Sequence, residues 1–290
     1  MKKELSNVEN GIYKLPYDLD LSYANQWNPA LVFNQLNRYV NDRKDVILRR
    51  SKKDGREIKR NFISNKYPDY YLQNFHYQSD GWLSQKSAEL YDYQVESLFL
   101  GSADAMRRQI LAPIHNFFKG KDTSDIKHLD LATGTGRFAS FFLDNYRNLD
   151  ATVMSLSPFY LAEAKKSLSK YDNVKYVEAA GEDMPFPSNT FDSITCVYMF
   201  HELPAKIRGQ VTAEIARVLK KGGKLFFVDS AQEGEVAFSR VLEGFTIIAH
   251  EPYYINYTKQ NLTELFLEHG LKVEEEEVNW VSKCITATKI

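Results

Sequence analysis

The strongest constraint on the fold is a glycine-rich turn that follows a short apolar segment. Residues 126–129 are typical of a buried strand, and the chain then runs Asp130-Leu131-Ala132-Thr133-Gly134-Thr135-Gly136 into a helical pattern. Gly134 and Gly136 lack a Cβ, so the backbone can turn tightly there and approach a ligand. The first N–H groups of the helix point toward the same ligand. Asp130 suits a ligand with an amino group better than one with a pyrophosphate.

From residue 126 onward, strand and helix patterns alternate, which is typical of a parallel sheet with crossover helices. We predict strands at 126–132, 151–156, 174–179, 191–199 and 224–229. We predict helices at 136–146, 158–170, 204–220 and 259–269. Residues 273–281 and 282–290 predict a hairpin that closes the sheet in an antiparallel sense. The fold class is therefore α/β.

The first 115 residues follow a different pattern and predict a mostly helical extension ahead of a second domain at 116–290. Helical spacing is present at Val32, Phe33, Leu36, Tyr39 and Val40. A further helix carries Tyr91, Val95, Leu98 and Phe99 on one face. The next helix is N-capped by Ser102 and carries Met106, Ile110, Leu111 and Ile114.

Net charge limits the partners that we expect. The 290 residues carry a net charge of −1, which provides no electrostatic argument for nucleic acid or an anionic membrane. Residues 38–66 are locally basic, with eleven Lys and Arg against four Asp and Glu, and such a stretch can bind phosphates. The interspersed acids favour a solvated surface, and a contact with nucleic acid or lipid is the alternative.

The cysteines and the apolar segments indicate where the chain resides. Cys196 and Cys284 lie in apolar segments without metal-ligand spacing, so we expect no metal site and a reducing compartment. We find no signal peptide, and no window approaches the roughly 18 apolar residues of a membrane span. We therefore expect a cytoplasmic protein. The oligomeric state is not predicted.

Four further motifs follow the glycine-rich turn in order. They are Leu156-Ser157-Pro158, Glu182-Asp183-Met184-Pro185-Phe186, Phe191-Asp192 and Lys221-Gly222-Gly223. In this order and spacing, the chain resembles the class I S-adenosylmethionine-dependent methyltransferases. Within them it is similar to the methyltransferase type 11 group, which includes the ubiquinone and menaquinone C-methyltransferases. It also resembles an uncharacterised subgroup of cyanobacteria and plastids through Tyr70-Tyr71-Leu72-Gln73-Asn74-Phe75-His76 and His250-Glu251-Pro252-Tyr253-Tyr254.

The resemblance implies a Rossmann-like sheet, S-adenosylmethionine as cofactor and S-adenosylhomocysteine as product. It places the methionine part of the cofactor on Asp130, Ala132, Thr133, Gly134 and Gly136. It places the remaining contacts on Ser155, Leu156, Gly181, Glu182, Asp183 and Phe200. A carboxylate near the turn can pair with the ammonium group of the cofactor.

Ser155 departs from the family pattern. The family usually has an acid here, which accepts hydrogen bonds from both ribose hydroxyls, and a serine hydroxyl accepts fewer and weaker ones. We therefore expect cofactor binding that is weaker or differently supported. The turn also satisfies the Gly-x-Gly-x-x-Ala form of a dinucleotide fingerprint, but no arginine follows Ser155 to receive a phosphate.

Two histidines are candidate catalytic bases. His201 follows the fourth strand, and ligands of such sheets lie outside the carboxyl ends of the strands. Its imidazole could deprotonate an acceptor, or it could equally cap or pack under the next helix. His250 is the second candidate, within a long segment before the helix at 259–269. We interpret that segment as a lid, with a helix near 234–247 and an aromatic strip.

Aromatic side chains from two parts of the chain are candidate substrate contacts. The lid supplies Tyr253 and Tyr254, and an N-terminal flap supplies Tyr71, His76 and Trp82. Packing of the flap and the lid onto the core is the alternative for all of them. Under the functional interpretation, residues 1–115 cover the substrate.

We therefore predict methyl transfer to a small apolar or aromatic acceptor by in-line displacement, with O-, C- and N-methylation left open. Two alternatives remain. An RNA methyltransferase would use the basic stretch at 38–66, and a non-catalytic protein would only bind S-adenosylmethionine. Ser155 motivates the second alternative.

Overall fold

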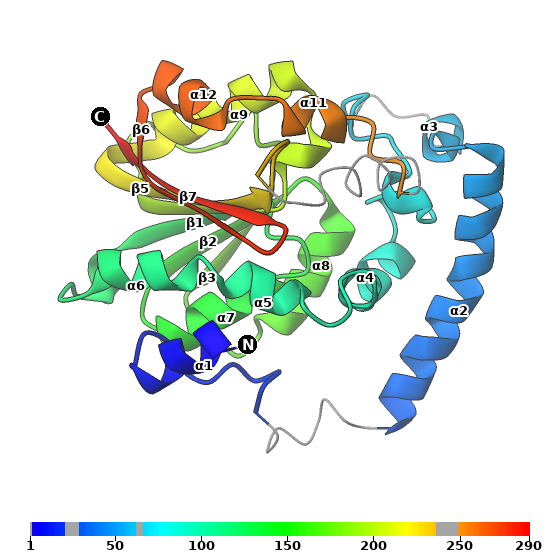
Figure 1. Cartoon of the computed structure of the whole chain (residues 1–290), viewed down its shortest axis with the longest axis horizontal. Coiled ribbons are helices and arrows are strands. Elements are labelled where there is room, and N and C mark those ends of the chain that lie inside the picture. The colour runs from blue at the N-terminus through cyan, green and yellow to red at the C-terminus, as the bar shows by residue number, and fades with distance from the viewer. Residues whose placement is uncertain (1, 21–28, 62–65, 236–248) are drawn as a thin grey trace.

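A seven-stranded sheet forms the centre of the molecule (Figure 1). The computed structural model describes residues 2–20, 29–61, 66–235 and 249–290. The sheet order is β3-β2-β1-β4-β5-β7-β6. The strands are β1 Lys127–Leu131, β2 Asp150–Ser155, β3 Val174–Glu178, β4 Phe191–Val197, β5 Leu219–Ser230, β6 Leu271–Asn279 and β7 Ser282–Lys289. Strands β1 to β5 pair in parallel, whereas β7 is antiparallel to β5 and β6. The α/β prediction and its closing hairpin are therefore confirmed.

Strand β5 begins five residues before its predicted start at 224. Leu219 pairs with Phe191, the register then shifts, and Lys224 pairs with Ser193. The motif Lys221-Gly222-Gly223 thus lies in an irregularity inside the strand. Gly222 has φ +76°, and a Cβ on Gly223 would lie 2.8 Å from the carbonyl oxygen of Lys220. These glycines allow the backbone to bulge without breaking the pairing.

Helices cover both faces of the sheet (Figure 1). On one face, α9 Ala205–Val218, α11 Tyr254–Thr258 and α12 Leu262–Glu268 enclose an apolar core with the strands. On the other face, α6 Leu111–Phe118, α7 Arg137–Asn145 and α8 Pro158–Ser167 enclose a second one. Asn261 caps α12, so this helix begins three residues after its predicted start. The helix predicted near 234–247 falls at 236–248, outside the described residues.

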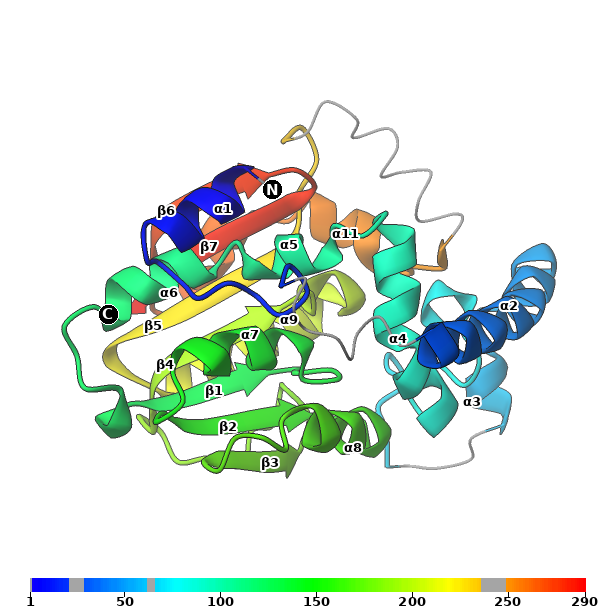
Figure 2. The ribbon, with the colours of Figure 1, turned by 90° about the horizontal axis from the view of Figure 1, so that it is seen from below.

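The N-terminal region is mostly helical, as expected. It contains α1 Lys2–Glu9, α2 Pro29–Lys52, α3 Glu57–Asn61, the short helix η2 Phe75–Tyr77, α4 Gln85–Leu98 and α5 Ala103–Arg108. Figure 2 shows α1 beside the β6–β7 edge, where Lys3 Nζ lies 2.6 Å from Glu277 Oε1. Helix α2 lies at the opposite end of the molecule (Figures 1 and 2).

The prediction of a single helix capped by Ser102 is wrong in two respects. It is divided into α5 and α6, and Pro113 explains the break, because its ring would clash with the carbonyl of Gln109 in a continuous helix. Ser102 occupies the N-cap position but makes no capping bond. Its hydroxyl instead donates to the carbonyl oxygen of Phe99 at 2.6 Å.

Two short connecting helices complete the described part: η3 Thr123–Asp125 before β1 and η4 Phe200–Glu202 after β4. Within the described ranges, no helix has the length and apolar character needed to cross a bilayer.

Candidate active site

A cavity of about 140 Å³ opens where the parallel strands end. Its walls come from the segments that follow β1, β2, β3 and β4, together with residues 70–107 of the N-terminal region and α8. Ligands of doubly wound sheets lie at this edge, because the crossovers leave a crevice there. Segments that are far apart in sequence thus meet in one place.

The glycine-rich turn forms the floor of the cavity. Thr133 N donates to the carbonyl oxygen of Met154 at 2.9 Å, and Gly136 N donates to that of Thr133 at 2.9 Å. Gly134 has φ +58°, and a Cβ there would meet nothing within 4 Å. Gly136 has φ +78°, and a Cβ there would lie 2.8 Å from Ser167 Oγ and 3.2 Å from Ala164 Cα. Gly136 therefore allows α7 to pack against α8, whereas Gly134 faces open space.

Asp130 carries one unused hydrogen-bond acceptor into the cavity. The side chain is buried, and its Oδ1 accepts a bond of 2.6 Å from the hydroxyl of Thr195. Its Oδ2 has no hydrogen-bond partner within the described part of the chain. Burial raises the pKa of Asp130 to about 6, although the hydrogen bond from Thr195 opposes the shift. A buried carboxylate oxygen without a donor fits a bound ammonium group.

The second half of the expected cofactor site contains an unexpected tyrosine. Ser155 and Leu156 line the cavity, and Ser155 Oγ already accepts a bond of 3.2 Å from Ser157 N. The hydroxyl of Tyr70 donates to Glu182 Oε1 at 2.6 Å, and Glu182 Oε2 is buried without a partner in the described residues. Sequence reasoning missed Tyr70, although it lies inside the motif at 70–76.

The other expected cofactor residues are placed in different ways. Ala132, Thr133 and Gly181 line the cavity, and a Cβ on Gly181 would lie 2.8 Å from Met199 Cε. Asp183 is exposed and is not part of the lining. Phe200 is fully buried in the core, where its ring lies 5.0 Å from that of Phe227.

An aromatic wall faces the glycine-rich turn. It consists of Phe75, Trp82, Tyr91 and Tyr160, which all line the cavity. The rings of Trp82, Tyr91 and Tyr160 are mutually edge-to-face, with centroids 5.3 to 5.4 Å apart. The wall is attached to the sheet by Ser157, whose hydroxyl donates to the carbonyl oxygen of Trp82 at 2.5 Å. Tyr71 also lines the cavity, so two of the five expected substrate contacts, Tyr71 and Trp82, reach it.

His201 lies behind the cavity and pairs with a buried acid. Its Nδ1 is 2.6 Å from Asp229 Oδ1, and Asp229 Oδ2 accepts a bond of 2.7 Å from Phe200 N. Burial alone lowers the pKa of His201, but the charge and the hydrogen bond of Asp229 outweigh burial and raise it to about 10. The pairing with Asp229 therefore favours the protonated imidazole at neutral pH.

Two glutamates lie near His201. Glu202 lines the cavity, and burial raises its pKa to about 7, although the charge of His201 and a hydrogen bond from Trp82 oppose the shift. The side chain of Glu251 is fully buried, and burial raises its pKa well above the usual value. Glu251 Oε1 lies 3.2 Å from His76 Nε2, near enough for an ion pair but not aligned as a hydrogen bond. Burial also lowers the pKa of His76 to about 3, so burial disfavours the charged form of both side chains.

His250, Tyr253 and Tyr254 pack the lid onto the rest of the molecule and do not line the cavity. His250 Nε2 lies 3.2 Å from Gln73 Oε1, and a Cβ on Gly55 would collide with its ring. The hydroxyls of Tyr254 and Ser230 are 2.5 Å apart. Tyr253 packs against the aromatic wall. Tyr253 and Tyr254, the two substrate contacts expected from the lid, thus lie outside the lining of the cavity.

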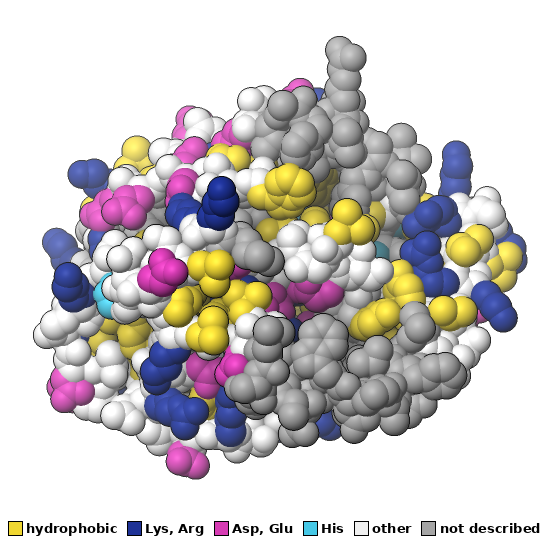
Figure 3. Space-filling model, turned by 60° about the horizontal axis from the view of Figure 1, so that its bottom comes forward, with side chains coloured by type: hydrophobic (Ala, Val, Ile, Leu, Met, Phe, Trp, Pro, Cys, Tyr) yellow, Lys and Arg dark blue, Asp and Glu magenta, His cyan; other side chains and the backbone are white. Residues whose placement is uncertain are grey.

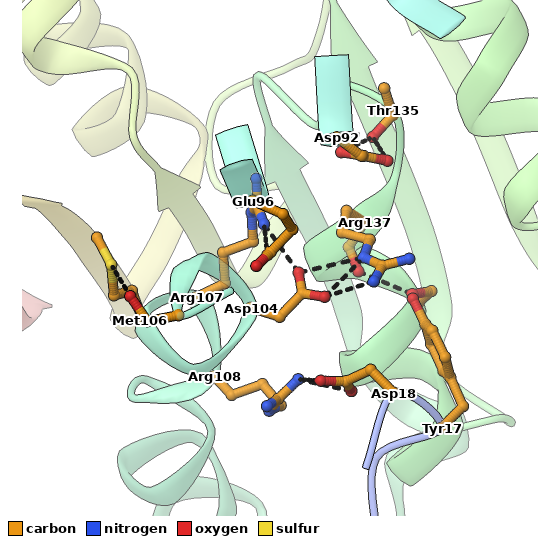
Figure 4. A network of polar contacts seen from close by, with 12 residues as sticks. Tyr17, Asp18, Asp92, Glu96, Asp104, Met106, Arg107, Arg108, Thr135 and Arg137 are labelled. Carbon is orange, nitrogen blue, oxygen red and sulfur yellow. Dashed lines mark hydrogen bonds and ion pairs between the residues drawn. The ribbon is translucent and has the colours of Figure 1, made fainter. Parts of the chain in front are cut away.

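A polar network ties the N-terminal region to the glycine-rich turn (Figure 4). The hydroxyl of Thr135 donates to both oxygens of Asp92 at 2.9 Å. Arg137 Nε donates to Asp104 at 3.0 and 3.1 Å, and Arg107 Nη1 donates to Asp104 at 2.8 Å. Asp92, Arg107 and Arg137 line the cavity. The prediction of a cofactor site named none of these three, and the partners of Asp92 and Arg137 are distant in sequence.

Comparisons with known proteins agree with this architecture. Residues 129–223 match a family model described as a methyltransferase domain. The chain is 29% identical over 215 residues to an uncharacterized methyltransferase of Geobacillus sp. (strain WCH70), covering 70% of this chain and 96% of the relative. It is 32% identical over 161 residues to the ubiquinone/menaquinone biosynthesis C-methyltransferase UbiE of Agrobacterium fabrum, covering 50% of this chain. The match spans 60% of the length of that second relative.

Solved structures share the fold. One is a chain from the complex between the Haloferax volcanii Trm112 methyltransferase activator and a methyltransferase, with a TM-score of 0.50 and 17% identity, covering 71% of this chain and 96% of that one. Another is the pyocyanin biosynthetic protein PhzM, with a TM-score of 0.50 and 16% identity, covering 64% of this chain and 59% of that one. The sheet order, the glycine-rich turn, the methyltransferase domain matched at 129–223 and these relatives support a class I S-adenosylmethionine-dependent methyltransferase.

Proposed function

We propose that this methyltransferase acts on a small acceptor with an apolar or aromatic body. The observation that carries the proposal is the pairing of two opposed surfaces in one cavity. Asp130 Oδ2, without a partner among the described residues, lies at the glycine-rich turn, and the aromatic wall faces that turn. The first surface fits the amino acid part of a methyl donor, and the second fits an apolar acceptor.

The donor half would hold S-adenosylmethionine through charge and backbone. Asp130 would pair with its ammonium group, and the open side of Gly134 admits the methionine part close to the backbone. Ser155, Glu182 and Tyr70 are the polar groups available to the ribose and the adenine. When bound, the cofactor supplies an electrophilic methyl group on a positively charged sulfur. The chain's own residues hold, orient and shield that group.

The acceptor half would align the nucleophile by packing. Tyr71, Trp82 and Tyr160 provide flat apolar surfaces, and each is fixed by neighbours rather than free to rotate. A fixed wall orients an apolar body at little entropic cost, and alignment of nucleophile, carbon and sulfur supplies most of the rate advantage. Buried hydroxyls such as that of Tyr160, 3.0 Å from Ser87 Oγ, already have partners in the protein.

We further propose that Glu202 accepts the proton when the acceptor must lose one. It is the acid that lines the cavity next to Trp82, and its raised pKa, about 7, suits a general base at neutral pH. His201 then acts as a positioning residue, because its cation is held by Asp229 and lies 3.9 Å from Glu202 Oε1. The base roles predicted for His201 and His250 stay predictions that no observation tests.

The test begins with the donor. Calorimetric titration should show that S-adenosylmethionine and S-adenosylhomocysteine bind, with Asp130→Asn weakening both by about 10- to 100-fold. Asp172→Asn, an exposed acid outside the cavity, serves as the matched control and should bind normally. Incubation with methyl-labelled donor and fractionated small-molecule extract should then label a compound of low molecular mass.

Each outcome is informative. Binding without labelled product in any extract would support a protein that only binds the cofactor. Label that appears in RNA and not in small molecules would contradict the proposed acceptor class. Absence of binding in the wild-type protein would contradict the donor site itself.

A further inference from the structure

Helix α2 presents an apolar stripe to solvent, although it is part of a folded domain. Val40, Ile47 and Leu48 are 50%, 54% and 52% exposed. Their spacing of seven and eight residues places them on one face of a helix. The opposite face is the one that packs inward, because Asp42 and Val46 are buried. The stripe is therefore the outward side of α2 and not an incompletely covered core.

Cations flank this stripe on both sides. Helical geometry places Lys44 between Val40 and Leu48, Arg43 on one border and Lys52 on the other. All three are exposed. Among the ion pairs of the described residues, none includes Lys44 or Lys52. Figure 3 shows Lys and Arg side chains gathered with apolar ones at the end of the molecule where α2 lies.

Other basic residues of the 38–66 stretch are neutralised within the protein. Arg38 pairs with Glu89 at 2.7 Å, Lys59 with Asp69 at 2.7 Å and Lys66 with Glu178 at 2.7 Å. Among the described residues, Arg43, Lys44 and Lys52 beside the stripe are outside these ion pairs, as are Lys53 and Arg56 farther along the chain. This arrangement differs from a phosphate-binding surface for nucleic acid, which has no use for exposed aliphatic side chains.

An aliphatic stripe bordered by Lys and Arg is the pattern of a helix that lies in a membrane interface. The aliphatic side chains enter the boundary between headgroups and acyl chains, and the cations are attracted to anionic headgroups. We propose that the outward face of α2 docks on an anionic phospholipid surface. The proposal is independent of the acceptor and of the role of the cavity.

The test uses the full-length protein and vesicles. Vesicles of phosphatidylcholine with 30% phosphatidylglycerol are compared with pure phosphatidylcholine in a flotation assay, at two salt concentrations. We expect at least tenfold stronger partitioning to the anionic vesicles, weakened by salt. The double variant Ile47→Ser/Leu48→Ser should lose at least tenfold of that partitioning. Lys44→Gln/Lys52→Gln should remove the preference for anionic vesicles.

Matched controls keep the test falsifiable. Ile255 and Leu267 are 50% and 55% exposed on α11 and α12, so Ile255→Ser/Leu267→Ser changes equally exposed aliphatic side chains elsewhere. Lys206→Gln/Lys272→Gln removes two exposed cations away from α2. Both controls should float like the wild type. Thermal unfolding confirms that every variant is folded.

Three results would overturn the proposal. The first is equal flotation of wild type and Ile47→Ser/Leu48→Ser. The second is binding to a single-stranded RNA oligonucleotide that depends on Lys44 and Lys52 while vesicles are not bound. The third is a dimer, seen by light scattering, that is lost in Ile47→Ser/Leu48→Ser without any binding to vesicles. The last result would assign the stripe to a second copy of the chain.

Discussion

The donor side and the acceptor side of the cavity are built in opposite ways. The part of the proposed donor side that would hold the methionine comes from consecutive residues, Asp130 to Gly136, whose backbone is held by glycines and by the start of a helix. The proposed acceptor side combines Trp82, Tyr160 and Glu202, which are 42 to 120 residues apart in the sequence and meet only in the folded protein. A local turn is enough to form the first side. The second side forms only when the N-terminal region packs against the sheet domain. We therefore expect the two sides to respond differently to substitution.

Substitutions at the two glycines of the turn should have the largest effects, one on protein stability and the other on cofactor binding. Gly136→Val places a side chain against Ala164 and Ser167 at φ +78°, and should lower the unfolding free energy by about 3–5 kcal/mol. Gly134→Ala meets no atoms, so it should cost only about 1–2 kcal/mol of stability. It should nevertheless weaken S-adenosylhomocysteine binding, because its Cβ points into open space beside the turn. Urea denaturation and calorimetry measure the two effects, and equal destabilisation by both variants would contradict this division.

The network in Figure 4 should be the link between the two sides. Asp104→Asn removes the acid that holds Arg107 and Arg137 together, and should destabilise the protein by about 3 kcal/mol. This loss of unfolding free energy is small for a broken buried ion pair, because Arg107 keeps Glu96 as a partner at 3.3 Å. Since Arg137 begins α7, cofactor affinity should fall as well. Unchanged affinity in a destabilised variant would show that the network only packs the N-terminal region and does not support the turn.

Asp130 should lower the unfolding free energy of the protein and strengthen the binding of the cofactor. Burial raises its pKa from 3.8 to about 6, so stability falls as pH rises from about 4 to 6, and the full penalty is present above 6. Asp130→Asn should therefore raise the unfolding free energy at pH 7 by about 1–3 kcal/mol while it weakens cofactor binding. In the wild type, affinity for S-adenosylhomocysteine should decline below pH 6, where the carboxyl is protonated. A flat affinity between pH 5 and 7 would argue against a bond from Asp130 to the ammonium group.

Ser155 should give the smallest effect. Ser155→Asp restores the acid that the family usually has, and should tighten binding of S-adenosylhomocysteine by about three- to tenfold. Ser155→Asn has a similar size without the charge and is the control. If Ser155→Asp binds no better than Ser155→Asn, then Tyr70 and Glu182 already supply the polar contacts, and the departure from the family pattern is compensated from the N-terminal region.

Prediction from the sequence succeeded where neighbouring residues determine the backbone. The strands, the crossover helices and the hairpin follow from periodicity and turn residues, and they lie close to their predicted positions. It was less successful where the backbone departs from a periodic pattern. Pro113 divides α5 from α6, and pairing with Phe191 extends β5 past Gly222 and Gly223. Both errors are local consequences of a clash or a pairing that a periodic pattern does not contain.

The chemistry of the site divides in the same way. From its sequence alone, the chain determined the fold class, the glycine-rich turn and the acid beside it, because glycine conformation and strand-to-helix order are properties of short segments. Only the tertiary structure decided that His201 is held as a cation by Asp229, 28 residues away, and that Glu202 and not His201 lines the cavity. The charge of a side chain depends on burial and on partners, and both are set by packing between segments that the sequence does not place together.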